Sequence, residues 1–327
     1  MPSPMPDSVY GFSFHALGGK GHIRIATATP SQAEAAVIDA VAWLRSAEAR
    51  YSRFLPQSLV SKLNRGERVR IDPEFRELLS ASKRSFSTTF GRIDASALPI
   101  WKLWHDPLRK SPPTCDELNQ ALRLKSLREI DPDENHLLLP RQEMGLDFGA
   151  IAKEWCVDQI VLRLQHRGLS NVLIELAGDI AARGKQSERH DGWWVLLSES
   201  RKAVLLQDAA LATSGHGTRF RTLGSQRISH LIDAQTGLPT ATQLRSATVL
   251  AASCMEAGTA ATDAALAPDL QTAHERVLPF PALFRTARNH FLATPSLLHL
   301  CREVADETAR KQHPVPFRNL HRLPAYA

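Results

Sequence analysis

The amino-acid sequence predicts an α+β fold. Three helical patterns with capping signals occupy the first 125 residues, and short β-like runs separated by glycine turns dominate the chain after residue 170. Helices and strands do not alternate strictly, so a doubly wound parallel sheet is not expected. The chain has 327 residues, 43% of them apolar and 23% charged, and can bury a sizeable core. This composition excludes a mainly disordered protein and a membrane channel.

Turn and capping residues mark the first elements. A short strand is expected over 21–28, after a glycine cluster. A helix should follow it, because Ser31 and Glu34 have the spacing of a capping box. Asp72 and Pro73 predict the start of a second helix, since proline is favoured in the first helical turn.

The middle of the chain carries further helix signals. Thr114, with Glu117 three residues later, predicts a helix start. A hairpin is expected around 132–135, where turn-forming residues cluster. A longer helix should run over about 150–167, and Gly168 can end it.

Short strands are expected after residue 170, several of them separated by glycine turns. A helix should begin near Met255, and a last amphipathic helix should cover 295–311. The expected strands span 172–176, 193–197, 204–206, 227–233 and 247–252.

The cysteines and the N-terminus favour a cytoplasmic protein. The four cysteines are too sparse for a disulfide scaffold and lack the spacing of zinc ligands. The first residues show neither the basic stretch nor the apolar core of a signal peptide. The most apolar segment, 247–266, is interrupted by Glu256 and Asp263, which makes it a poor membrane span.

The surplus of positive charge lies near the C-terminus. The net charge is +6, and residues 285–327 contain six Arg and one Lys against three acidic residues. We therefore expect a domain over 1–284 and a basic, partly helical extension over 285–327. This extension is either a solvated helix on the core or a docking segment for an acidic partner, and nucleic acid is not the expected partner.

The segment around Asp147 combines a strand end, a turn of small residues and a helix start. Asp147-Phe148-Gly149 matches a metal-binding tripeptide of protein kinases, but the other kinase motifs are absent, which excludes that class. Lys153 lies in the first turn of the expected helix, where backbone N–H groups and a lysine suit a phosphate or pyrophosphate. The alternative is an ordinary turn with a solvated lysine.

Other segments carry weaker chemical signals. His230 and Asp233 could act as a base and its orienting group, although taken alone His230 is better interpreted as a strand histidine with an ordinary partner. Thr262, with Asp263 and Glu256 nearby, could hold Mg²⁺ together with substrate phosphates, or could form the polar face of an alanine-rich helix.

Taken together and in order, these motifs resemble the ApbE family, the FAD:protein FMN transferases. The central motif reads Leu-Asp-Phe-Gly-Ala-Ile-Ala-Lys over 146–153, and the resemblance covers roughly residues 12 to 267. The matching segments are 51–58 with 61–64, 91–96 with Pro99 and Trp101, 146–153, 175–180, 212–215, and 230–233 with 236–239.

The resemblance implies both a fold and a reaction. The fold would be a mixed α/β architecture with a flavin cleft between two lobes. The enzyme would cleave the pyrophosphate of FAD with Mg²⁺, transfer FMN to a Thr or Ser hydroxyl of a target flavoprotein, and release AMP. Mg²⁺ bridging the phosphates would neutralise the charge that develops during transfer.

The resemblance also assigns site residues. His230 would be a base or a phosphate contact, and Lys153 would add positive charge beside the pyrophosphate. The Ala150 backbone carbonyl and the Thr262 hydroxyl would be metal ligands. The positions that match FAD contacts are Leu17, Phe54, Arg92, Ile93, Asp94, Asp147, Lys153 and Ile232.

Two departures from the family pattern stand out, and the first of them concerns the metal site. Gly258 stands where the family has an Asp four residues before the Thr, and Glu154 follows the central Lys where the family often has Gly. Without the Asp, Mg²⁺ binding should be weak, because few anionic oxygens remain to replace its water shell. Asp263 or Glu256 could compensate.

Three functions therefore remain open from the sequence. The first is a working FMN transferase with an altered metal site, which the retained Asp147, Lys153, Asp179, His230 and Thr262 favour. The second is a flavin-binding protein that has lost transfer and acts as a carrier or regulatory partner, which Gly258 favours. The third is an FAD pyrophosphatase, because water can replace the target hydroxyl.

Overall fold

The computed structural model describes residues 9–303 and 317–319, except positions 27, 198–199, 201, 217–219, 225 and 243. The helices in this part of the chain are α1 (Pro30–Tyr51), α2 (Leu59–Leu63), α3 (Pro73–Thr88), α4 (Leu98–His105), α5 (Cys115–Leu124), the 3₁₀ helix η1 (Leu127–Glu129), α6 (Ala152–His166), α7 (Cys254–Ala265), α8 (Leu270–Val277) and α9 (Pro295–Leu300).

The strands of the described residues form one large sheet and several small ones. The strands are β1 (Val9–Ala16), β2 (Gly19–Ala26), β3 (Val69–Arg70), β4 (His136–Leu137), β5 (Val172–Leu176), β6 (Asp179–Arg183), β7 (Trp193–Leu197), β8 (Lys202–Leu206), β9 (Ala209–Gly215), β10 (Phe220–Leu223), β11 (Gln226–Ser229), β12 (Ile232–Asp233), β13 (Leu238–Pro239), β14 (Leu244–Ala251), β15 (Ala282–Thr286), β16 (Phe291–Ala293), β17 (Cys301–Glu303) and β18 (Phe317–Asn319).

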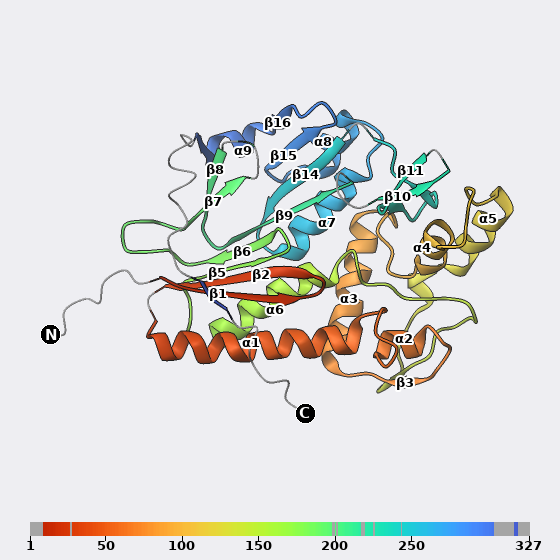
Figure 1. Ribbon diagram of the computed structural model, residues 1–327, viewed down its shortest axis with the longest axis horizontal. Helices are drawn as coiled ribbons and strands as arrows, with labels where there is room; N and C mark the ends of the chain where they lie inside the picture. The colour runs from red at the N-terminus through yellow and green to blue at the C-terminus, as the bar shows by residue number, and fades with distance from the viewer. Residues whose placement is uncertain are drawn as a thin grey trace.

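The large sheet has nine strands in the order β16-β15-β14-β9-β6-β5-β2-β1-β18. Neighbouring strands are antiparallel except β1 and β18, which are parallel. The helices α4 and α5 and the β10–β11 hairpin lie together beyond one end of this sheet (Figure 1). The mixed α/β architecture expected from the sequence is confirmed.

The main core lies between the large sheet and the helices α1, α3 and α6. Strand β2 turns alternate side chains inward, so that Ile23 and Ile25 are fully buried. In α1, Val37, Val41 and Leu44 follow the helical repeat and are also fully buried. The helical repeat of these apolar residues thus selects the face of α1 that packs on the core.

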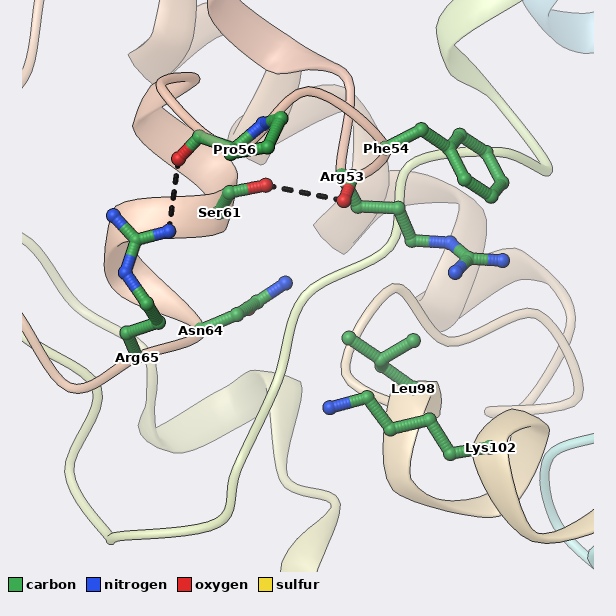
Figure 2. Close-up of a pocket in the computed structure, with 8 residues that line it drawn as sticks. All are labelled: Arg53, Phe54, Pro56, Ser61, Asn64, Arg65, Leu98 and Lys102. Atoms are coloured by element: carbon green, nitrogen blue, oxygen red, sulfur yellow. Dashed lines mark hydrogen bonds between the residues drawn. The ribbon is translucent and has the colours of Figure 1, made fainter. Parts of the chain in front are cut away.

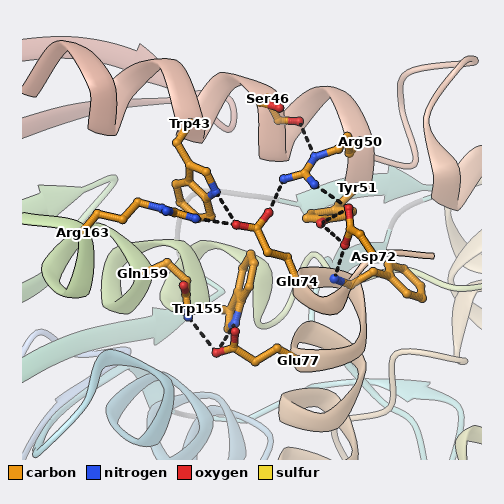
Figure 3. A network of polar contacts seen from close by, with 11 residues as sticks. Trp43, Ser46, Arg50, Tyr51, Asp72, Glu74, Glu77, Trp155, Gln159 and Arg163 are labelled. Atoms are coloured by element: carbon orange, nitrogen blue, oxygen red, sulfur yellow. Dashed lines mark hydrogen bonds and ion pairs between the residues drawn. The ribbon is translucent and has the colours of Figure 1, made fainter. Parts of the chain in front are cut away.

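A polar network ties α1, α3 and α6 together. Figure 3 shows Glu74 of α3 receiving hydrogen bonds from Trp43, Arg50 and Arg163. Burial alone would raise the pKa of Glu74, but the hydrogen bonds from Arg50 and Trp43 outweigh it and lower the pKa. Glu74 therefore remains a carboxylate that links three helices.

The helix starts were predicted with one correction. Asp72 caps α3, and Thr114 with Glu117 forms the capping box of α5, as expected. The capping box of α1, however, is formed by Thr29 and Gln32 rather than by Ser31 and Glu34. Pro30 occupies the first helical position, which moves the start two residues earlier.

Three other expected elements differ from the structure. The hairpin around 132–135 is absent, because β4 pairs with the distant β3 instead. The segment forms a turn in which the Asp133 carboxylate accepts the His136 N–H. The expected strand 227–233 is divided into β11 and β12. The helix over 295–311 ends at Leu300, because Cys301 begins a strand that pairs with β8; residues 304–311 lie outside the described part.

The expected domain boundary at residue 284 falls inside β15, the sheet neighbour of β14. Leu297 of α9 is buried in a cluster that also contains Leu283 and Trp193. The described residues that follow 284 therefore pack as part of the same fold. None of the helices in the described part of the chain is long and apolar enough to cross a bilayer.

Candidate functional site

The first turn of α6 meets the start of β6. Lys153 on α6 forms an ion pair with Asp179, whose side chain is only 1% exposed. The Thr213 N–H lies 3.4 Å from Asp179 Oδ1 and donates to it. Three motifs that are far apart in the sequence, 146–153, 175–180 and 212–215, thus meet at one place.

Two neighbouring turns border this place. Leu17, in the turn between β1 and β2, and Ala177, in the turn between β5 and β6, both adopt a φ of 51°. The Ala177 N–H donates to the Lys20 carbonyl at 2.9 Å. A Cβ on Gly19 would lie 2.6 Å from the Ala177 Cβ, so the close contact of the two turns requires glycine at 19.

Arg53, which the sequence analysis did not select, organises the neighbouring surface. Its guanidinium lies 2.8 Å from Asp147 Oδ2 and stacks over Phe54 and Trp101 at 4.1 and 4.0 Å from the ring centroids. Asp147 Oδ1 accepts the Gly149 N–H, which fixes the turn before α6. Phe54 is 73% exposed, so its ring is available to a ligand.

A pocket of about 240 Å³ opens beside Arg53 (Figure 2). Arg53, Arg65 and Lys102 line its wall, although Arg53 is paired with Asp147 and Arg65 with Glu67, each at 2.8 Å. Two hydrogen bonds fix the backbone of the pocket wall. The Arg65 side chain donates to the Pro56 carbonyl, and the Ser61 hydroxyl donates to the Arg53 carbonyl.

The two positions assigned to metal ligands lie on adjoining elements. Ala150 is in the turn before α6 and shares a small cavity with Asp147 and Ile93. Thr262 is buried on α7, which packs against α6. Asp158 of α6 fixes the relative position of these helices by accepting the N–H groups of Cys254 and Met255 at 2.8 and 2.9 Å. Burial raises the pKa of Asp158 despite these two hydrogen bonds.

The two acids that could compensate for Gly258 make other contacts in this structure. Asp263 is held by Arg92 through two hydrogen bonds of 2.5 and 2.8 Å, and Arg276 also approaches it. This hydrogen bonding raises the pKa of Arg92. Glu256 is exposed and contacts the capping Ser253. Glu154, which the sequence analysis noted only as a departure from the family pattern, is buried on α6 and lies against Gly258.

The remaining predicted residues occupy different surroundings. Ile93 is buried, and Asp94 is 1% exposed, accepts hydrogen bonds from Ser96, and lies 3.7 Å from Lys125. Ile232 is half-buried against the cluster around Trp104. His230 is half-buried and lies between β11 and β12. Ile93 thus lies beside the turn before α6, whereas Ile232 packs with residues of α4 and α5.

Comparisons with known proteins identify similar sequences and structures. A FAD:protein FMN transferase of Vibrio cholerae is 31% identical over 186 residues, which is 53% of this chain and 55% of that protein. One of Haemophilus influenzae is 28% identical over 233 residues, or 65% of this chain and 67% of that protein. The matched segment thus spans little more than half of the Vibrio relative.

Solved structures share the fold. The flavin transferase ApbE of Vibrio cholerae has a TM-score of 0.74 at 22% identity and covers 90% of this chain and 100% of its own. The flavinyl transferase ApbE of Pseudomonas stutzeri, in its apo form, has a TM-score of 0.78 at 22% identity, with 90% and 97% covered. The model of the ApbE family matches residues 17–276, and because this is more than half of the chain, the protein belongs to the ApbE family.

Proposed function

We propose that this protein is an FAD:protein FMN transferase, which moves FMN from FAD to a Thr or Ser hydroxyl of a target flavoprotein. The observation that carries the proposal is the contact of Lys153 with Asp179 and of Asp179 with the Thr213 N–H. Family members named for this activity support it.

The proposed reaction balances as a phosphoryl transfer. The acceptor oxygen forms a bond to the phosphorus of the FMN half, the bond from that phosphorus to the bridging oxygen breaks, and AMP leaves. The hydroxyl proton passes to a base, for which His230 is the proposed residue. Lys153 would place positive charge beside the pyrophosphate, where it favours the charge that develops on the transferred and leaving groups.

FAD is proposed to bind along the surface that joins the two turns to the Arg53 pocket. The proposed contacts are Leu17, Phe54, Arg92, Ile93, Asp94, Asp147, Lys153 and Ile232. The exposed ring of Phe54 suits a planar flavin, and the three cationic side chains of the pocket suit its anionic parts.

Mg²⁺ is the proposed cofactor. Within the described residues, no group of three His, Cys, Asp or Glu side chains could hold a metal. Mg²⁺ does not require such a group of three side chains, since it is commonly held by one or two carboxylates together with substrate phosphates and water. The Ala150 carbonyl and the Thr262 hydroxyl are the proposed ligands, and a buried carboxylate oxygen of Glu154 without a hydrogen-bond partner fits a cation here. When bound, the metal would neutralise phosphate charge.

The test is the intact mass of an acceptor flavoprotein after incubation with the purified protein, FAD and Mg²⁺. A gain of the mass of FMN less one water, abolished by EDTA, supports the proposal. FAD binding without a gain on any of several acceptors, and without AMP, would support a protein that binds flavin but has lost transfer. AMP and free FMN without a gain would support a pyrophosphatase.

We also propose the cytoplasm as the compartment. All four cysteines are free thiols, and Cys156 and Cys254 are buried, which suits a reducing environment. Fractionation of cells that express the full-length protein tests this, and recovery outside the cytoplasm would contradict it.

A further inference from the structure

We infer that Glu154 of α6 supplies the carboxylate of the metal site, in the space that a side chain at position 258 of α7 would otherwise occupy. This inference deepens the proposed function and rests on it, since that function brings the metal to the site. It is carried by the contact between Glu154 and Gly258.

Glu154 fills the space above Gly258. A Cβ built on Gly258 would lie 2.4 Å from Glu154 Cγ, 3.0 Å from its carboxylate carbon and 3.1 Å from Oε1. Real Cβ atoms do not approach other atoms this closely, so no side chain fits at 258 while Glu154 keeps this position. The Glu154 side chain of α6 therefore fills the space beside Gly258, a position at which α7 itself provides no carboxylate.

The carboxylate of Glu154 is buried and incompletely paired. The residue is 8% exposed, and its Oε2 has no hydrogen-bond partner. Its charged neighbour, Lys153, lies 3.7 Å from Oε1, which is too long for a hydrogen bond, and the same ammonium is in closer contact with Asp179. A buried carboxylate oxygen without a partner is costly, and a bound cation would satisfy it.

The register of α6 and α7 places this carboxylate next to the proposed ligands. Asp158 contacts the α7 residues Cys254 and Met255, and Glu154, one turn earlier on α6, contacts Gly258, one turn later on α7. One turn further along α7 lies Thr262, whereas Ala150 lies before α6, in the segment that leads into its non-helical cap Ile151. The proposed hydroxyl ligand is thus one turn of α7 from Gly258, and the proposed carbonyl ligand lies just before the turn of α6 that carries Glu154.

The test is the affinity for Mn²⁺, a paramagnetic substitute for Mg²⁺, measured from the EPR signal of the free ion with FAD present and no acceptor protein. Glu154→Gln keeps the shape and removes the charge, and should weaken Mn²⁺ binding at least tenfold. Glu275→Gln is the matched control, since Glu275 is an exposed acid on the neighbouring α8 that contacts Gln271, and should leave the affinity unchanged. Wild-type Mn²⁺ affinity in a folded Glu154→Gln variant would overturn the inference.

A reciprocal exchange provides a second, independent variant. Glu154→Gly combined with Gly258→Asp moves the carboxylate from α6 to α7 and should restore Mn²⁺ affinity to within about threefold of wild type, whereas Gly258→Asp alone should clash with Glu154. A folded double variant with the weak affinity of Glu154→Gln would contradict the inference.

Because no transfer is measured, loss of Mn²⁺ affinity in Glu154→Gln together with an inactive wild type would refute the proposed function and leave the role of Glu154 standing.

Discussion

Lys153 and Asp179 form the ion pair on which the proposed site is built. Asp179 is 1% exposed and Lys153 25% exposed, so the pair is largely removed from water. A buried carboxylate left without its cation keeps the cost of desolvation and loses the compensating attraction. The pair therefore has a structural role in addition to the proposed contact with FAD.

We predict that Lys153→Met lowers the free energy of unfolding by roughly 3 kcal/mol, because it strands the Asp179 carboxylate. The double variant with Asp179→Asn should recover more than half of this loss but no transfer activity. Urea unfolding of the two single variants and the double variant measures the coupling. Additive losses would contradict a direct interaction between the two side chains.

Thr262 gives a second prediction at this scale. Thr262→Ala should weaken Mg²⁺ affinity about tenfold, because a hydroxyl ligand is lost, while the thermal midpoint stays close to that of wild type. Isothermal titration with Mg²⁺ in the presence of FAD measures the affinity. Thr259→Ala is a control on the same helix, since Thr259 contacts Ser85 instead. An unchanged Mg²⁺ titration of Thr262→Ala would refute its placement as a ligand.

The sequence predicted Lys153, Asp147 and Thr262 through motif order, but it could not predict Glu154 or Arg53. The pairing of Glu154 with Gly258 depends on how α6 and α7 pack, and 104 positions of sequence separate the two residues. The only available signal was that both positions depart from the family pattern. Arg53 carried no signal, because its role depends on stacking between Phe54 and Trp101.

At the scale of elements, Asp158 attaches the start of α7 to α6. It accepts two N–H groups of the first turn of α7, and Ser253 accepts a third from Glu256. The free N–H groups at a helix start need such partners. This arrangement sets the register that brings Glu154 to Gly258.

Asp158→Ala should lower the free energy of unfolding by about 1–2 kcal/mol, because it removes a cap that is shared between two helices. Asp269→Ala removes the exposed cap of the short α8 and should cost less than Asp158→Ala. Chemical denaturation of both variants tests the comparison. An Asp158→Ala loss no larger than that of Asp269→Ala would contradict the coupling of the two helices.

The start of α5 gives a pH prediction. The hydrogen bond from Arg109, together with the Thr114 N–H, lowers the pKa of Glu117 from 4.5 to about 2. Because the folded-state pKa is depressed, the stabilisation by ionised Glu117 is complete above about pH 4.5 and is lost as the pH falls towards 2. NMR titration of the Glu117 carboxyl should show a midpoint well below 4.5, and Arg109→Met should move it upward. An unshifted midpoint in the Arg109→Met variant would contradict this cause.

At the scale of the whole molecule, the chain after residue 284 is part of the fold up to the last described strands. Deleting 285–327 would divide β15 and remove β16, α9, β17 and the edge strand β18, whereas deleting 304–327 removes only β18 among these elements. We predict that the longer deletion abolishes cooperative unfolding and that the shorter one lowers the thermal midpoint by only a few degrees. Calorimetry of both proteins tests this, and similar midpoints would contradict it.

The shorter deletion also tests the docking role proposed for the basic extension. Residues 304–327 contain three Arg and one Lys against two acidic residues. If they attract an acidic acceptor, their removal should slow transfer at low salt and have little effect at high salt, because exposed charges are screened. Equal transfer rates at all salt concentrations would leave only a structural role.

Local signals predicted much of the fold, and tertiary pairing decided the rest. Capping residues identified the starts of α3 and α5, because these hydrogen bonds lie within four residues. The pairing of β4 with β3 and of β17 with β8 joins segments more than 60 residues apart, which no local pattern specifies. For this reason the expected hairpin around 132–135 and the long last helix were wrong.

The most direct test of the account is the stoichiometry of a single incubation with FAD, Mg²⁺ and an acceptor flavoprotein. AMP is quantified by chromatography and the FMN-bearing acceptor by intact mass in the same sample. A transferase releases one AMP for each acceptor molecule that gains FMN, and an acceptor whose target hydroxyl has been replaced gains none. Release of AMP without modified acceptor, or no AMP from a protein that binds FAD, would contradict the proposed function.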